Sequence, residues 1–342
     1  MTKKIFRFVS LALLLVITAL LLLVLIPHKY NVPALSERAC TRYWKLPTGS
    51  RIAYIMIPAK GIKKPFPVLF LQGGPGGPVY DRNIAQLSPL ADEGFDVYLY
   101  DQVGCGFSER LGKIAEYTVK RQTRDLEEII KIIGSQKIIL IGQSWGAMFA
   151  ADFVAGFPEK VEKIIFTSPG PVLPADYSLA GIIPPDSLQL REPVFTNRQG
   201  RKKVYSLRSE FVEFCAKKFG WKLASDKEMD DFATILNFEM GKSTVCDTSN
   251  AGPMQNGAGY YCMVKTAQSF GQVTDKRDKL IKCGVPVLIM KGQCDNIKWG
   301  YTSEYIKLFT NHRFVLIPNA GHVIGIEQPG IYIKTISDFL NE

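Results

Sequence analysis

This chain of 342 residues has few histidines, no paired metal-binding cysteines and no blocks of basic residues. It has only three histidines, so few side chains can act as a base near neutral pH. None of its seven cysteines stands in a Cys-x-x-Cys pair, the spacing typical of zinc sites, and we expect no metal or other cofactor. Of the net charge of +10, four charges lie in the first thirty residues, which contain no acid, and the rest is spread thinly. We therefore expect no nucleic-acid partner.

A long apolar run lies near the start of the chain. No charged residue occurs from Phe8 to Ile26, and three basic residues precede the run. As a helix it would span roughly 28 Å at about 1.5 Å per residue, close to the thickness of a hydrocarbon core. We expect residues 1–30 to be a signal anchor whose transmembrane helix contacts the lipid bilayer through residues 8–26. The basic residues predict an extracytoplasmic (periplasmic or extracellular) catalytic domain. The alternative is secretion after cleavage near residues 32–34.

That placement makes disulfide bonds expected. Cys246 and Cys262 flank a loop rich in glycine and asparagine and form the first candidate pair. Cys283 and Cys294 flank one apolar run and form a weaker candidate pair. An odd number of cysteines leaves at least one thiol free.

Short apolar runs recur through the rest of the chain, and helical patterns separate them. A strand with alternating polarity is predicted at Arg51–Ile57, followed by buried strands at Val68–Leu71, Val97–Tyr100, Ile138–Ile141, Lys163–Phe166, Val287–Met290 and Phe314–Ile317. One of the helical patterns is capped by Thr118 and ended by Gly134. This alternation predicts an α/β fold with a mostly parallel, doubly wound sheet.

The alternation stops in the segment 173–283. This stretch is rich in proline, asparagine, aromatic and charged residues, and it contains helical patterns at Ser209–Lys218 and Lys227–Met240. We expect a helical cap subdomain over residues 173–283. It would be inserted into a catalytic domain formed by residues 41–172 and 284–342.

The most informative motif is Gly142-Gln143-Ser144-Trp145-Gly146, directly after the apolar run Ile138–Ile141. A Gly-x-Ser-x-Gly at the end of a strand and the start of a helix is a nucleophile elbow. The two glycines let neighbouring backbones close on a strained turn, and the serine hydroxyl stands above the sheet at a helix N-terminus. We expect Ser144 to be the nucleophile.

A serine hydroxyl needs an adjacent base, and the scarcity of histidine narrows the choice. His28 borders the apolar N-terminal run and His312 precedes the last predicted strand, whereas His322 follows that strand. Functional loops follow the carboxyl ends of strands, so His322 is the expected base. Asp295 follows the strand Val287–Met290 and is the expected acid, since the order in this arrangement is Ser, Asp, His. The alternatives are a structural histidine and an exposed loop aspartate.

The oxyanion of an acyl-transfer intermediate needs two N–H donors. The backbone N–H of Trp145, directly after the nucleophile, is the first candidate. The second should come from the glycine-rich loop Gln72–Pro78, which follows the strand Val68–Leu71. Gly74 is the preferred donor there and Gly73 the next.

Together these motifs resemble the proline iminopeptidase group of the α/β-hydrolases. The resemblance rests on Gly73-Gly74-Pro75-Gly76, Asp101–Ser108, the elbow at Ser144 and Gly321-His322. It implies the α/β-hydrolase fold and a serine aminopeptidase. Such an enzyme releases N-terminal residues from short peptides, without a metal.

The chain departs from this group at two motif positions. Gln72 stands where the group usually has histidine before Gly-Gly-Pro-Gly, and Val103 stands where it has arginine in Asp-Gln-Arg-Gly. The group also binds the substrate amine through cap glutamates, and the candidates for substrate binding here are Gln72 together with Glu192, Glu210, Glu213 and Glu239. Two alternatives stay open, namely an esterase or other acyl hydrolase and a catalytically silent binding protein.

Overall fold

The computed structural model describes residues 2–342, and for positions 2–4, 17, 19–21 and 23 it describes the backbone alone. Its centre is an eight-stranded sheet with the order β1-β2-β4-β3-β5-β6-β7-β8. β2 pairs antiparallel with both β1 and β4, and the remaining pairs are parallel. The strands are β1 (Arg42–Lys45), β2 (Arg51–Ile57), β3 (Val68–Leu71), β4 (Val97–Tyr100), β5 (Ile138–Gln143), β6 (Val161–Thr167), β7 (Val287–Gly292) and β8 (His312–Ile317).

All seven strands predicted from the sequence are confirmed, with ends that differ by at most two residues. β1 was not predicted, because its Arg-Tyr-Trp-Lys sequence has charged residues at both ends and is not an apolar run. β8 begins at His312 and not at Phe314, so His312 lies within the strand.

The sheet is covered by helices on both faces, as the alternating pattern predicts. Leu69 and Leu71 of β3 pack into one core, while Val68 and Phe70 pack into the other. The first core is completed by α4 (Val119–Ile133), α5 (Trp145–Gly156) and α11 (Trp299–Leu308). The second is completed by α2 (Asp81–Leu87), α3 (Pro89–Asp92), α12 (Ile324–Glu327) and α13 (Pro329–Leu340).

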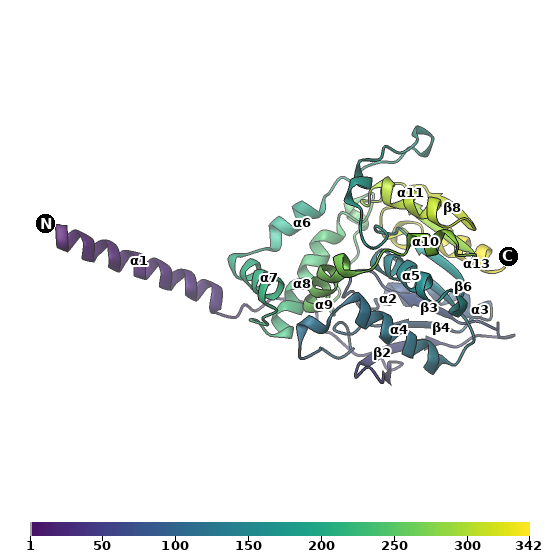
Figure 1. The fold of residues 1–342 in the computed structure, drawn as a ribbon, viewed down its shortest axis with the longest axis horizontal. Helices are drawn as coiled ribbons and strands as arrows, with labels where there is room; N and C mark the ends of the chain where they lie inside the picture. The colour runs from purple at the N-terminus through teal and green to yellow at the C-terminus, as the bar shows by residue number, and fades with distance from the viewer. Residues whose placement is uncertain (1) are drawn as a thin grey trace.

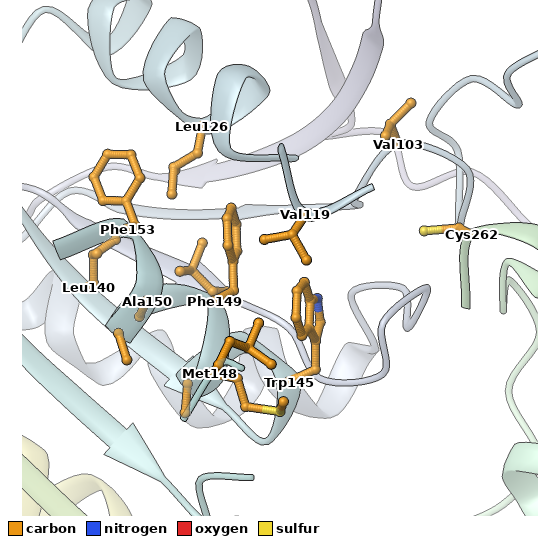
Figure 2. Packing of buried hydrophobic residues seen from close by; sticks show 14 of the residues in the cluster. Val103, Val119, Leu126, Leu140, Trp145, Met148, Phe149, Ala150, Phe153 and Cys262 are labelled. Atoms are coloured by element: carbon orange, nitrogen blue, oxygen red, sulfur yellow. The ribbon is translucent and has the colours of Figure 1, made fainter. Parts of the chain in front are cut away.

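Helix α5 is the central helix of the first core. Trp145, Phe149 and Phe153 on α5 belong to the same buried cluster as Leu126 and Val119 of α4 (Figure 2). The Trp145 and Phe149 rings stack with centroids 5.6 Å apart. Because α5 is enclosed almost all round, the turn that leads into it is held rigidly against the sheet.

The segment between β6 and β7 is helical, as predicted. It contains α6 (Asn197–Val204), α7 (Leu207–Phe219), α8 (Asp226–Gly241), α9 (Tyr260–Gln268) and α10 (Arg277–Ile281). α7 and α8 begin two and one residues before the predicted patterns, because Ser206 and Ser225 cap their first turns. In Figure 1, α6 to α9 lie together on the side of the sheet from which the N-terminal helix projects.

The N-terminal helix α1 (Thr2–Leu25) extends away from the rest of the chain (Figure 1). Its end is fixed to the helical segment, since Arg208 donates a hydrogen bond to the Val24 carbonyl and the His28 N–H donates to Glu228 Oε1 at 3.0 Å. Within the described part of the chain, no helix combines the length and the apolar character that crossing a membrane requires. The transmembrane helix predicted for residues 8–26 is therefore not supported.

Candidate active site

The turn between β5 and α5 has the geometry of a strained elbow. Ser144 has φ 55° and ψ −114°, a backbone conformation that residues with a side chain rarely adopt. A Cβ on Gly146 would lie 1.9 Å from the Leu71 carbonyl oxygen, and one on Gly142 would lie 2.5 Å from the Gly146 carbonyl oxygen. Both positions therefore require glycine, which is the physical reason for the Gly-x-Ser-x-Gly pattern.

The glycine-rich loop after β3 lies against this elbow. A Cβ on Gly73 would be 3.3 Å from Ser144 Cβ. The Gly73 N–H donates to Gln72 Oε1 at 2.8 Å, so it is already engaged. In contrast, the N–H groups of Gly74 and Trp145 donate to no other group among the residues that the structure describes. Of the three predicted oxyanion donors, Gly74 and Trp145 remain available and Gly73 does not.

Gln72 was predicted to contact substrate, but its contacts are internal. Its side chain is 3% exposed. The Nε2 group donates to the Pro78 carbonyl at 2.8 Å and to Asn83 Oδ1 at 2.7 Å. With Oε1 accepting from Gly73, the whole amide is used to brace the loop, and these contacts give no support to the predicted substrate contact.

A second buried amide, Gln102, joins the loop to the elbow. Its Nε2 donates to the Gln72 carbonyl at 2.8 Å, while its Oε1 accepts from the Gly76 N–H at 3.3 Å and from Trp145 Nε1 at 3.2 Å. No role was predicted for Gln102 from the sequence. Its place in Asp-Gln-Val-Gly after β4 was the available signal.

His322 and Asp295 are brought together, as predicted. The loops after β8 and β7 carry them, and His322 Nδ1 lies 2.8 Å from Asp295 Oδ1 with both side chains buried. An ionised carboxylate only accepts, so Nδ1 carries the proton and Nε2 is left as the acceptor. No hydrogen bond joins Ser144 to His322 in the described residues, although such contacts commonly form only with substrate.

Lys291, at the end of β7, holds the other oxygen of the same carboxylate. Its Nζ donates to Asp295 Oδ2 at 3.0 Å and to the Ile297 carbonyl at 2.6 Å, and the lysine and aspartate side chains are 1% and 0% exposed. Burial alone would raise the pKa of Asp295, but the charge of Lys291, followed by His322, lowers it well below its ordinary value. The carboxylate therefore stays ionised. No role was predicted for Lys291 from the sequence, although a lysine at the end of the apolar run Val-Leu-Ile-Met-Lys-Gly indicates a buried charge that needs a partner.

The loop that carries His322 is fixed to the helical segment. Glu327 accepts from the Gly321 N–H at 2.8 Å and from the Cys246 N–H at 2.8 Å. The Val323 N–H donates to the Thr244 carbonyl at 3.1 Å. These contacts place the chain around Thr244–Cys246 directly on the histidine loop.

A disulfide bond makes the same connection covalent. Cys246 is bonded to Cys294, the residue before Asp295. Both predicted pairings, Cys246 with Cys262 and Cys283 with Cys294, are therefore wrong. Cys262 lies on α9, where its thiol is buried beside Thr266, and the folded chain brings Cys294 to Cys246 from 48 residues away.

Three of the four predicted cap glutamates form ion pairs with lysines. Glu192 pairs with Lys298 at 2.6 Å and Glu239 with Lys242 at 2.8 Å, while Glu213 pairs with Lys217 and accepts from the Tyr205 hydroxyl at 2.6 Å. Glu210 is exposed on α7. No contact in the described residues brings any of the four to Ser144.

Comparison with known proteins agrees with this architecture. Residues 67–329 match the alpha/beta hydrolase fold family. A proline iminopeptidase of Lactobacillus helveticus is 32% identical over 87% of this chain and 97% of its own, and one of Saccharolobus solfataricus is 22% identical over 86% and 90%. A thermophilic esterase from Thermogutta terrifontis superposes with a TM-score of 0.61 at 21% identity, covering 89% of this chain and 98% of its own.

The family match covers well over half of the chain, and the Lactobacillus relative matches nearly end to end. An enzyme of the hydrolase type follows from both. The chain belongs to the α/β-hydrolase family and, within it, to the proline iminopeptidase-like group.

Proposed function

We propose that this protein is a serine hydrolase that acts through an acyl-enzyme on Ser144 and cleaves short peptides as an aminopeptidase. The observation that carries the proposal is the buried His322–Asp295 pair at the carboxyl ends of β7 and β8. The strained Ser144 at the carboxyl end of β5 lies on the same edge of the sheet.

In this mechanism Ser144 Oγ attacks the substrate carbonyl carbon while its proton passes to His322 Nε2. Asp295 accepts the Nδ1–H and stabilises the resulting imidazolium. The N–H groups of Trp145 and Gly74 stabilise the oxyanion. The intermediate collapses when His322 gives the proton to the leaving amine. Water then attacks the ester carbonyl carbon while His322 takes its proton, and the second intermediate collapses as that proton returns to Ser144 Oγ and the acid is released.

An esterase or other acyl hydrolase is the second candidate. The observation that favours it is that Glu192, Glu213 and Glu239 each already pair with a lysine, and no contact brings them to Ser144 in the described residues. Acyl transfer to serine is common to both activities. Peptide β-naphthylamides and short p-nitrophenyl esters separate them, because only an enzyme with peptidase activity turns over the amides efficiently.

We also propose that the protein works in an oxidising compartment outside the cytoplasm. The support is the bond between Cys246 and Cys294, since disulfides persist in such compartments and are rare in the cytosol. Alkylation of native protein from its source cell followed by mass spectrometry tests this. Finding both cysteines alkylated without prior reduction would contradict it.

Labelling with a fluorophosphonate probe tests the nucleophile. We expect the probe to label the wild-type protein at Ser144, and Ser144→Ala to lose labelling and to lower turnover by roughly 10⁴-fold or more. Ser178→Ala, at an exposed serine of the helical segment, is the matched control and should keep both. Turnover that persists in Ser144→Ala would overturn the proposal.

A further inference from the structure

A small cavity lies between the helical segment and the loops of the candidate active site. Its volume is about 70 Å³, room for several water-sized groups. It is lined by Tyr80 and Arg82 at the start of α2, by Val323 beside His322, and by helical-segment residues that include Asn237, Phe238 and Gln255.

Arg82 is an unusual residue to line such a cavity, because no acceptor among the described residues binds its guanidinium. The Nε atom is shut off from solvent without a hydrogen-bond partner, and no carboxylate in the described part of the chain lies within ion-pair distance of this side chain. Burial lowers the pKa of Arg82 from its ordinary value. Arginine nevertheless remains charged at neutral pH, so the protein maintains a partly buried cation without a counter-charge.

The Arg82 guanidinium lies over the ring of Tyr80. The Arg82 carbon Cζ lies 4.1 Å from the ring centroid, a cation–π geometry. This contact orients the guanidinium but accepts none of its N–H groups in the ring plane. The fork of donors is therefore held in place and left open, which is the arrangement that binds a carboxylate in two places.

The cavity offers an acceptor as well. Gln255 lines the same cavity, and its buried amide oxygen has no hydrogen-bond partner among the residues that the structure describes. A cationic fork and a lone amide oxygen together complement a carboxylate that lies next to an N–H group. The C-terminal residue of a peptide has this pair.

The cavity adjoins the loop that carries His322. Val323, one of its walls, directly follows His322. On the other side, Asn83 accepts from the Tyr80 N–H at 3.0 Å and from Gln72 Nε2 at 2.7 Å, which ties the Arg82 turn to the glycine-rich loop. The Arg82 turn and the chain directly after His322 therefore border the same cavity.

We propose that Arg82 binds the free C-terminal carboxylate of the substrate in this cavity, so that the preferred substrates are very short peptides with an unblocked C-terminus. The proposal rests on the proposed function, since it specifies the substrate of the same site. It gives the unpaired arginine in the wall of this cavity a ligand.

The test compares a dipeptide acid with its amide on protein that cannot turn it over. In full-length Ser144→Ala protein, calorimetry with Pro-Ala and Pro-Ala-amide should give at least about tenfold tighter binding of the acid, because the amide cannot form a charge-assisted pair. Adding Arg82→Gln should reduce this ratio to near one, and Arg82→Lys should leave an intermediate ratio. Arg198→Gln, at an exposed arginine of α6, is the control and should keep the full ratio.

Equal affinity for acid and amide, or a preference that survives Arg82→Gln, would overturn the inference. If neither dipeptide binds, propionate and propionamide are the probes of the cavity itself. Saturable binding of propionate that Arg82→Gln abolishes would keep the carboxylate site and reject the dipeptide, whereas no binding of propionate would reject the site. Fluorophosphonate labelling of Ser144 reports separately on the proposed function, so the two failures are distinguishable.

Discussion

Two cations stand near the loop of His322, Lys291 fully buried and Arg82 partly buried, and they differ in what they touch. Lys291 is enclosed and bonded to Asp295 Oδ2 and the Ile297 carbonyl. Arg82 lines a cavity, and its guanidinium stacks on the Tyr80 ring without a hydrogen-bond acceptor among the described residues. A buried charge is tolerated when its partners replace water, and it is costly when they do not. Lys291, whose N–H groups have acceptors, therefore helps to position Asp295. Arg82, whose N–H groups have none among the described residues, is a candidate for binding a ligand.

The largest effect is expected from removing the charge of Lys291. Lys291→Met leaves the Asp295 carboxylate buried without its counter-charge, and we expect the free energy of unfolding to fall by about 3–5 kcal/mol. Chemical denaturation measures this. The control is Lys137→Met, which breaks the partly exposed pair with Glu162 at 3.0 Å and should cost less than about 1 kcal/mol. Equal costs for the two variants would mean that Lys291 contributes no more than a surface pair.

The same variant should change the pH dependence. The depressed pKa of Asp295 contributes stability that is present above the ordinary carboxyl range near pH 4 and is lost as the pH falls toward the folded-state value. Without Lys291, burial dominates and raises that pKa, so Asp295 takes up a proton at higher pH. We therefore expect the difference in unfolding free energy between wild type and variant, measured by chemical denaturation at a series of pH values, to shrink as the pH falls below the ordinary carboxyl range. A difference that stays constant with pH would show that Lys291 does not control the ionisation of Asp295.

The disulfide gives the next largest effect, because it holds the residue before Asp295 to the helical segment. Cross-linking Cys246 to Cys294 closes a separation of 48 residues, and losing it should cost about 2–4 kcal/mol. Reductant should therefore destabilise the wild-type protein but not the Cys246→Ser/Cys294→Ser variant. Cys40→Ser, at an exposed free thiol, is the control and should respond as wild type does. Wild-type stability that is indifferent to reductant would contradict this role.

The elbow and the pair of His322 with Asp295 could be placed from the sequence because local chemistry determines them. Gly142 and Gly146 stand at positions where the backbone leaves no room for a Cβ, and the turn that needs them leaves a recognisable pattern. The buried strands could also be predicted from the sequence, since buried parallel strands form near-continuous apolar runs. Because the chain has only three histidines, His322 could then be chosen as the base from its position after the last predicted strand.

What the sequence did not reveal depends on contacts between distant segments. The partner of Cys294 is set by how the helical segment meets the loop after β7, and no spacing rule contains that information. The bracing role of Gln72 depends on Asn83 and Pro78 in the same way. Arg82 stands in Val-Tyr-Asp-Arg-Asn, which looks like the solvated start of a helix, and only the folded chain shows that its guanidinium has no acceptor.

The smallest effect has the opposite sign and tests the comparison most directly. Arg82→Met removes a charge that has no partner in the described chain, so we expect the free energy of unfolding to stay the same or to rise by up to about 1 kcal/mol. Arg110→Met is the matched control, since its guanidinium pairs with Asp230 at 2.9 Å, and it should destabilise the protein clearly. Chemical denaturation of both variants gives the answer. If Arg82→Met costs as much as Arg110→Met, the stacking on Tyr80 holds the cavity wall together, and the open guanidinium loses its value as evidence for a bound carboxylate. If the two variants differ in sign, the chain keeps Arg82 at the expense of its own stability, as expected for a residue that binds substrate.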